Sequence, residues 1–261
     1  MRFIFLSALF FVAFFCCAFT QLGPGPAGVK TVVIDAGHGG HDPGCKFGNI
    51  EEKKVALSIA LKVGNLIKEN CKDVSIIYTR ADDTFVELWE RALIANRNHA
   101  AVFISIHCNA NKTTTVYGTE TYTMGLHKSD DNLEVAKREN EVILMEDDYT
   151  ERYDGFDPKS PESDIIFELF QDAYMDQSLR LAAKVESQFK DRVKRKSRGV
   201  KQAGFVVLWK TAMPSILVET GFLSNPTERA FLTSDAGQNE VASGIFRAFK
   251  EFKTEVESTS P

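Results

Sequence analysis

The chain has 261 residues, of which 44% are hydrophobic and 26% are charged, and this length supports one sizeable hydrophobic core. Its formal net charge is -5 and its pI is near 5.6. A basic surface is typical of proteins that bind nucleic acid, so we expect no nucleic-acid partner.

The first 20 residues have the pattern of a secretory signal peptide. Arg2 is followed by an almost unbroken apolar run, which ends in small residues and is too short to span a bilayer comfortably. Lipid attachment at Cys16 or Cys17 is less favoured, because bulky phenylalanines precede them. We therefore expect export across the inner membrane to the periplasm, without a stable membrane span.

Three cysteines remain after the predicted signal peptide: Cys45, Cys71 and Cys108. An odd number without regular spacing predicts no disulfide framework, although an exported protein could form one. None of the three has the spacing of a thiolate metal site.

Residues 32–44 (VVIDAGHGGHDPG) predict a buried strand that passes into a glycine-rich loop. The loop carries His38, and glycines on both sides leave space beside its imidazole. Such a loop suits a functional site. The pattern is also compatible with an ordinary surface histidine in a turn. The remaining motifs must therefore distinguish a functional His38 from a surface residue.

Strands and helices alternate in the next part of the chain. We expect helices at residues 51–70 and 85–98, and strands at 74–78, 101–106 and 117–123. This alternation predicts a single α/β domain, with a central, mostly parallel mixed sheet that is twisted and covered by helices on both faces. The domain should extend over residues 28–256.

An acidic segment at residues 129–178 has the character of an insertion. It contains 16 Asp and Glu residues against 4 Lys and Arg residues, whereas residues 180–201 contain 9 basic and 2 acidic residues. Apolar periodicity at residues 165–173 predicts that part of the insertion is helical. The basic residues should form the outer face of a helix at 178–194.

The rest of the chain completes the predicted domain. We expect short strands at residues 205–208 and 214–218 and a helix at residues 237–252.

Polar side chains follow three of the predicted strands: His38, His107 and Glu219. A fourth, Glu52, begins the first predicted helix. The carboxyl ends of neighbouring strands line one crevice in an open α/β sheet, so these side chains can meet. Two imidazoles and one carboxylate are a ligand set of catalytic zinc, and a second carboxylate can act as the base.

Each of these residues also has a simpler interpretation. Glu52 lies three residues after Asn49, as in a helix capping box, and Glu219 could be a helix-capping acid. His41 is a further possible ligand, while a Cys108–His107 pair is disfavoured because adjacent strand residues point to opposite faces. We expect His99 and His127 at the surface.

Four segments in this order resemble the zinc-dependent N-acetylmuramoyl-L-alanine amidases, which cut the amide bond between muramic acid and the stem peptide of peptidoglycan. They are residues 35–44 (DAGHGGHDPG), 52–57 (EKKVAL), 105–110 (SIHCNA) and 219–225 (ETGFLSN). The resemblance covers the chain from about residue 30 to residue 252. The family usually has a small residue in place of Cys108.

The resemblance implies that His38, Glu52 and His107 bind zinc and that Glu219 is the general acid/base. It implies peptidoglycan as the substrate, in cell-wall remodelling or daughter-cell separation. A single α/β domain is implied as well, and we expect a monomer. Rival interpretations are a zinc peptidase that cuts between amino acids of the same polymer, and a wall-binding or regulatory protein that has lost catalysis.

Some members of the family carry an inserted helix that covers the zinc until a partner displaces it. The acidic segment occupies the same stretch of chain, which implies autoinhibition and a protein activator. The candidate carboxylates for the zinc are Glu162, Asp164 and Glu168. The alternative is that the segment forms a wall of the substrate cleft or elaborates the surface.

Overall fold

The computed structural model describes residues 28–153, 155–158, 160 and 173–259. The predicted signal peptide and most of the predicted helical stretch at 165–173 lie outside these residues. Within them, no helix has the length and apolar character that a membrane crossing requires.

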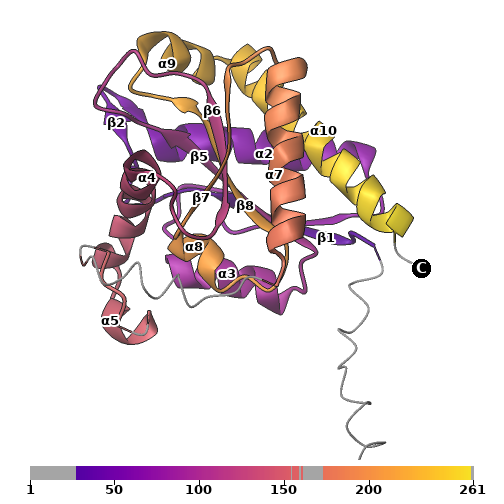
Figure 1. Ribbon diagram of the computed structural model, residues 1–261, viewed down its shortest axis with the longest axis horizontal. Helices are drawn as coiled ribbons and strands as arrows, with labels where there is room; N and C mark the ends of the chain where they lie inside the picture. Colours follow the sequence, from indigo (N-terminus) through magenta and orange to yellow (C-terminus); the bar gives the residue numbers. More distant parts are fainter. Residues whose placement is uncertain (1–27, 154, 159, 161–172, 260–261) are drawn as a thin grey trace, which may run out of the picture.

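A six-stranded sheet forms the centre of the molecule, with the strand order β4-β1-β5-β8-β6-β7 (Figure 1). All neighbouring strands are parallel except β6 and β8, so the sheet is mixed and mostly parallel, as predicted. The strands are β1 (Thr31–Ala36), β4 (Ser75–Tyr78), β5 (Val102–Asn109), β6 (Thr119–Met124), β7 (Ser197–Ala203) and β8 (Ser215–Phe222). A separate two-stranded ribbon pairs β2 (Lys46–Phe47) with β3 (Ile50–Glu51).

Helices cover both faces of the sheet, which confirms the predicted α/β class. One face packs against α2 (Glu52–Asn70), α7 (Met175–Asp191) and α10 (Asp235–Thr259). The other face packs against α3 (Leu88–Arg97), α4 (Asp130–Asn140) and α8 (Val206–Trp209). The acidic segment supplies α4, followed by η1 (Glu141–Met145) and α5 (Tyr149–Arg152), and Figure 1 shows α4 and α5 at one side of the molecule, away from α10.

Two predictions near the carboxyl half are wrong, and one helix is missing from the predictions. Residues 205–208 were predicted as a strand, but residues 206–208 belong to the short helix α8. The prediction failed because a short apolar run does not distinguish a buried strand from a buried helix. The helix of the basic segment ends at Asp191, and its last basic residues belong to the edge strand β7. A further helix, α9 (Pro226–Leu232), begins directly after the segment that carries Glu219; Asn225 caps it and Pro226 occupies its first turn.

The strand register places polar residues side by side on one face of the sheet. His107 of β5 lies beside Glu219 of β8, and Glu219 lies beside Glu120 of β6. Paired residues on neighbouring strands point to the same face. The chain therefore brings together groups that are 99 and 112 positions apart in sequence.

A buried ion pair supports the loop that follows β1. Arg91 of α3 contacts Asp35 at 3.0 Å and donates a hydrogen bond to the His38 carbonyl at 2.9 Å. Asp35 also accepts hydrogen bonds from Thr79 and Ser105. Burial by itself would raise the pKa of Asp35, but Arg91 and the two hydroxyls hold it below its usual range.

Replacing Arg91 with Leu is expected to lower the free energy of unfolding by about 3 kcal/mol, because Asp35 would remain buried without its partner. Urea unfolding followed by circular dichroism measures this change. Arg97→Leu, at an exposed position of the same helix, should change the stability by no more than about 0.5 kcal/mol. Equal effects of the two substitutions would contradict a structural role for the buried pair.

Candidate metal and catalytic site

His38 is presented by the glycine-rich loop directly after β1. Its backbone lies in the left-handed region, at φ 62, and its side chain is buried. The Nδ1 atom of the ring lies 2.7 Å from Asp42 Oδ2, and this contact orients the imidazole so that Nε2 faces the interior of the site. Gly44 is required here, because a Cβ atom at this position would lie 2.6 Å from the His38 ring.

Glu52 begins α2 but does not cap it. The N-cap residue is Glu51, which forms no side-chain cap hydrogen bond, so the capping-box interpretation is wrong. Instead, the Glu52 carboxylate accepts hydrogen bonds from the backbone nitrogens of Cys45 and Cys108, each at 2.9 Å. These two bonds fix a fully buried carboxylate at the end of β5, beside both histidines.

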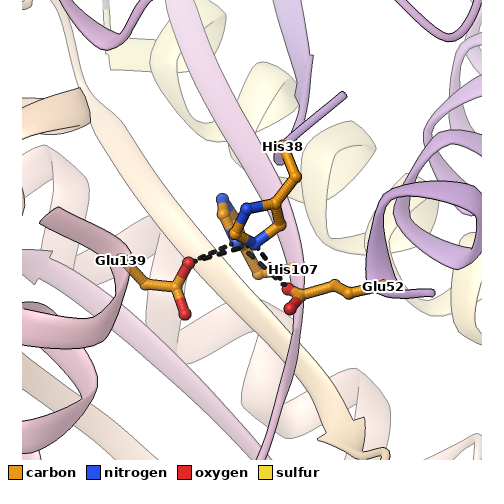
Figure 2. Close-up of side chains that lie close together, drawn as sticks. All are labelled: His38, Glu52, His107 and Glu139. Atoms are coloured by element: carbon orange, nitrogen blue, oxygen red, sulfur yellow. Dashed lines mark ion pairs between the residues drawn. The ribbon is translucent and has the colours of Figure 1, made fainter. Parts of the chain in front are cut away.

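Four side chains converge at this point: His38, Glu52, His107 and Glu139 (Figure 2). Glu52 Oε1 lies 3.1 Å from His38 Nε2 and 3.3 Å from His107 Nδ1. Glu139 Oε2 lies 3.2 Å and 3.1 Å from the same two nitrogens. In Figure 2 the two carboxylates approach the imidazoles from opposite sides, Glu52 from α2 and Glu139 from α4.

The spacing of these four atoms is compatible with a shared metal ion. Zinc bonds of about 2.0 Å to nitrogen and oxygen give edges of about 3.3 Å in a tetrahedral site. The four contacts between an imidazole and a carboxylate are 3.1, 3.2, 3.1 and 3.3 Å, and all four ligand atoms lie within 4.8 Å of one another. Yet His38 Nε2, His107 Nδ1 and Glu139 Oε2 are buried and form no hydrogen bond of acceptable geometry with any described atom. This is the arrangement expected when the atoms are ligands of a shared metal ion and do not form hydrogen bonds with one another.

The charges of the group also favour a cation. Burial disfavours the charged imidazole of His107, but Glu139 and Glu52 raise its pKa to about 9. The site therefore holds positive charge between its carboxylates, either as protons on the imidazoles or as a metal ion. Gly37 keeps the space open, since a Cβ atom there would lie 2.4 Å from the His107 ring.

Glu219 lies beside the group without being one of its four members. It is fully buried, and neither carboxylate oxygen has a hydrogen-bond partner among the described residues. Burial and the nearby Glu139 carboxylate raise its pKa well above the usual range. Arg138 of α4 approaches Glu219 Oε1 at 3.5 Å. A carboxyl group in such surroundings is a candidate acid/base.

A cleft of about 390 Å³ opens beside the four converging side chains. Its lining includes His38, Cys45 and Glu52, together with Arg138 of α4 and residues 141, 142, 144 and 145 of η1. The acidic segment therefore narrows the approach to the site.

The structure brings together all four residues that the sequence motifs predicted. Among the described histidines, His41 lies outside the group and packs against Phe85, with 4.0 Å between the ring centroids. Glu162, Asp164 and Glu168, predicted to face the metal, lie outside the described residues. The carboxylate that reaches the histidines in the described part of the acidic segment is Glu139, which the sequence interpretation missed. Val135, Ala136 and Glu139 share the buried face of α4, and their helical spacing does not indicate which part of the protein this face contacts.

The chain matches the model of a known family, described as N-acetylmuramoyl-L-alanine amidase, over residues 32–251. It is 31% identical over 221 residues to the N-acetylmuramoyl-L-alanine amidase AmiA of Escherichia coli (strain K12). This similarity covers 84% of the chain and 74% of the relative.

Solved structures with the same fold include an N-acetylmuramoyl-L-alanine amidase from Clostridium difficile 630, with a TM-score of 0.63 and 31% identity. The amidase AmiC2 of Nostoc punctiforme matches with a TM-score of 0.63 and 30% identity. Each match covers 86% of this chain and 97% of the solved chain.

Proposed function

The chain belongs to the N-acetylmuramoyl-L-alanine amidase family, and from this membership we propose that it hydrolyses the amide bond between N-acetylmuramic acid and L-alanine of peptidoglycan with a bound zinc ion. His38, Glu52 and His107 would hold the zinc, and Glu219 would be the general acid/base. The observation that carries the proposal is the convergence of four buried ligand atoms within 4.8 Å of one another, beside a buried carboxyl group that forms no hydrogen bond with the described residues.

Each residue has a distinct part in this reaction. Bound zinc supplies a Lewis acid that polarises the scissile carbonyl and makes water more acidic. Glu219 takes the proton of the attacking water and delivers it to the nitrogen of the leaving L-alanine. Asp42 holds the His38 ring in its ligating orientation, and the backbone nitrogens of Cys45 and Cys108 hold Glu52.

Replacement of His38 or His107 by Ala is expected to abolish the binding of about one zinc ion per chain, because the remaining imidazole and Glu52 alone make a weak site. Metal analysis of the purified protein measures this loss. His41→Ala is the matched control, since His41 is an exposed imidazole on the same loop and should leave the metal content unchanged. Full metal content in both ligand variants would exclude the proposed ligand set.

The bond that is cut distinguishes an amidase from a zinc peptidase of the same polymer. Digestion of purified peptidoglycan should release peptides with L-alanine at their new amino terminus and leave glycan strands without stem peptides. Mass spectrometry of the products identifies these ends. New amino termini within the stem peptide would support the peptidase instead, and intact peptidoglycan after treatment with zinc-loaded enzyme would support a non-catalytic wall protein.

We also propose that α4 inhibits the enzyme. Glu139 would fill the position on the zinc that the substrate must occupy, and Arg138 pairs with Glu219 on the same side. Arg138 further donates hydrogen bonds to the Ala110 carbonyl at 3.0 Å and to Asn109 Oδ1 at 3.1 Å. One helix thus covers the metal group and the acid/base together. A protein activator that displaces α4 would expose both.

The cellular setting that fits this activity is the periplasm. We propose that the signal peptide directs export across the inner membrane, and that the monomeric enzyme acts in cell-wall remodelling or daughter-cell separation. A regulated amidase suits this setting, because uncontrolled hydrolysis would weaken the wall. Fractionation of cells that produce the full chain tests the location, and light scattering of the purified protein tests the oligomeric state.

A further inference from the structure

A second charged group lies beside Glu219, one strand further along the sheet. Glu120 of β6 is paired in register with Glu219 and is only 2% exposed. Its Oε1 atom accepts hydrogen bonds from Arg198 Nε and Lys201 Nζ of β7, each at 2.6 Å. Its Oε2 atom accepts from the Tyr122 hydroxyl and the Asn109 amide, at 2.8 and 3.0 Å.

This group carries more positive than negative charge. Two cations share a single carboxylate oxygen, and Glu120 is the one acid that contacts Arg198 or Lys201 among the residues that the structure describes. Burial by itself would raise the pKa of Glu120, but Lys201 and Arg198 hold it below its usual range. The Glu120 carboxylate is therefore ionised, and the direct ion pairs of this group leave one positive charge in excess.

The unbalanced charge is accessible and is held in place. The side chains of Arg198 and Lys201 are 26% and 18% exposed. The Arg198 guanidinium lies 5.5 Å from the centroid of the Phe222 ring, and its Nε atom is fixed by Glu120. Within the described part of the chain, no acceptor bonds to its two terminal nitrogens, which are the pair that binds a carboxylate in a bidentate manner.

The distance between Glu219 and β7 indicates which residue of the substrate can reach Arg198 and Lys201. Neighbouring strands lie about 4.8 Å apart, so β7 lies roughly 10 Å from Glu219 on β8, with β6 between them. An extended peptide spans about 3.5 Å per residue. A side group of the second or third residue after the scissile amide therefore reaches β7.

We propose that Arg198 and Lys201 form a subsite for a free carboxylate of the stem peptide, carried by the second or third residue beyond the bond that is cut. This inference rests on the proposed amidase function and adds a preference for acidic over amidated stem peptides. Arg198 binds the carboxylate through its terminal nitrogens, and Lys201 supplies the second charge. Glu120 positions both cations.

The competing explanation is that the three charges only attach β7 to β6. In that case a substitution would lower stability and reduce hydrolysis of every substrate by the same factor. A true subsite instead changes the ratio between two substrates that differ in one carboxylate. This ratio is insensitive to inhibition by α4, because both substrates meet the same population of uncovered enzyme.

The test compares two synthetic muramoyl peptides, identical except that the carboxylate of the second or third residue is free in one and amidated in the other. The zinc-loaded full chain should prefer the free acid by roughly tenfold in kcat/KM, mainly through a lower KM, because a charge-assisted contact is present in both the bound ground state and the transition state. Arg198→Gln should bring the ratio close to one. Lys201→Gln should reduce it in part.

Arg192→Gln, at an exposed position after α7, is the matched control and should leave the ratio unchanged. Equal kcat/KM values of the wild-type enzyme for the two peptides would overturn the subsite, whether or not the variants fold. A parallel fall for both peptides in Arg198→Gln would overturn it as well. If neither peptide is cleaved at the muramoyl amide, the proposed function fails rather than the subsite.

Discussion

Replacement of Glu219 by Gln is expected to lower the turnover of peptidoglycan by roughly 100-fold or more while the protein keeps its fold and its zinc. The substitution conserves the shape of a fully buried side chain but removes the carboxylate that would transfer the proton in the proposed reaction. Glu219 is not one of the four converging donors, so its loss should leave the metal content unchanged. Rates of release of stem peptide and metal analysis of the same preparation measure both effects.

Glu52→Gln provides the comparison that separates the two carboxylates. Glu52 contacts both imidazoles within 3.3 Å, so its neutralisation should weaken metal binding as well as activity. Addition of zinc should restore part of the activity of Glu52→Gln and none of that of Glu219→Gln. If the two variants retained metal equally well, the division of roles between them would be wrong.

Replacement of Glu139 by Gln is expected to change activity in the opposite direction and to raise the basal rate roughly tenfold or more. The reason is that α4 would lose its charge-assisted contact with the metal group, and such contacts contribute about 1.5–3 kcal/mol to the equilibrium between covered and uncovered enzyme. Hydrolysis of peptidoglycan without any added partner measures the effect. Limited proteolysis within residues 130–145 should also become faster.

Glu134→Gln is the matched control for this substitution, because Glu134 lies on the exposed side of the same helix. It removes one negative charge from α4 without touching the metal group, and the basal rate should not change. A folded, zinc-loaded Glu139→Gln enzyme with unchanged or lower activity would reject autoinhibition. It would favour the alternative in which the acidic segment forms a wall of the substrate cleft.

The comparison of Glu219 with Glu139 shows what local sequence can reveal. Both are fully or nearly fully buried carboxylates beside the same histidines. Glu219 ends an apolar run and begins a recognisable motif, so its position at a strand end was predictable. Glu139 lies within a polar, acidic stretch, and its direction depends on how α4 docks against the sheet. The apolar periodicity at residues 165–173 predicted a helix there, and the sequence interpretation placed the candidate carboxylates beside that helix instead.

The strand and helix assignments failed for a related reason. Residues 205–208 are apolar and short, and only their place beneath α3 makes them a helix rather than a strand. The basic residues of β7 have no alternating apolar pattern, because this edge strand is only partly buried. The carboxylate that Arg198 and Lys201 share, Glu120, lies far away in sequence.

The sequence by itself determined the α/β class and the single domain, and it predicted four residues of the candidate site, His38, Glu52, His107 and Glu219. Each of these depends on a local signal, namely a strand or helix boundary within a short motif. Only the tertiary structure decided that Glu139 approaches the histidines and that Arg198 and Lys201 share Glu120 beside Glu219. These contacts depend on the packing of elements and on charge pairs between them. Arg198 and Lys201 lie 78 or more positions from Glu120 in sequence, and no local pattern encodes a pairing over such a separation.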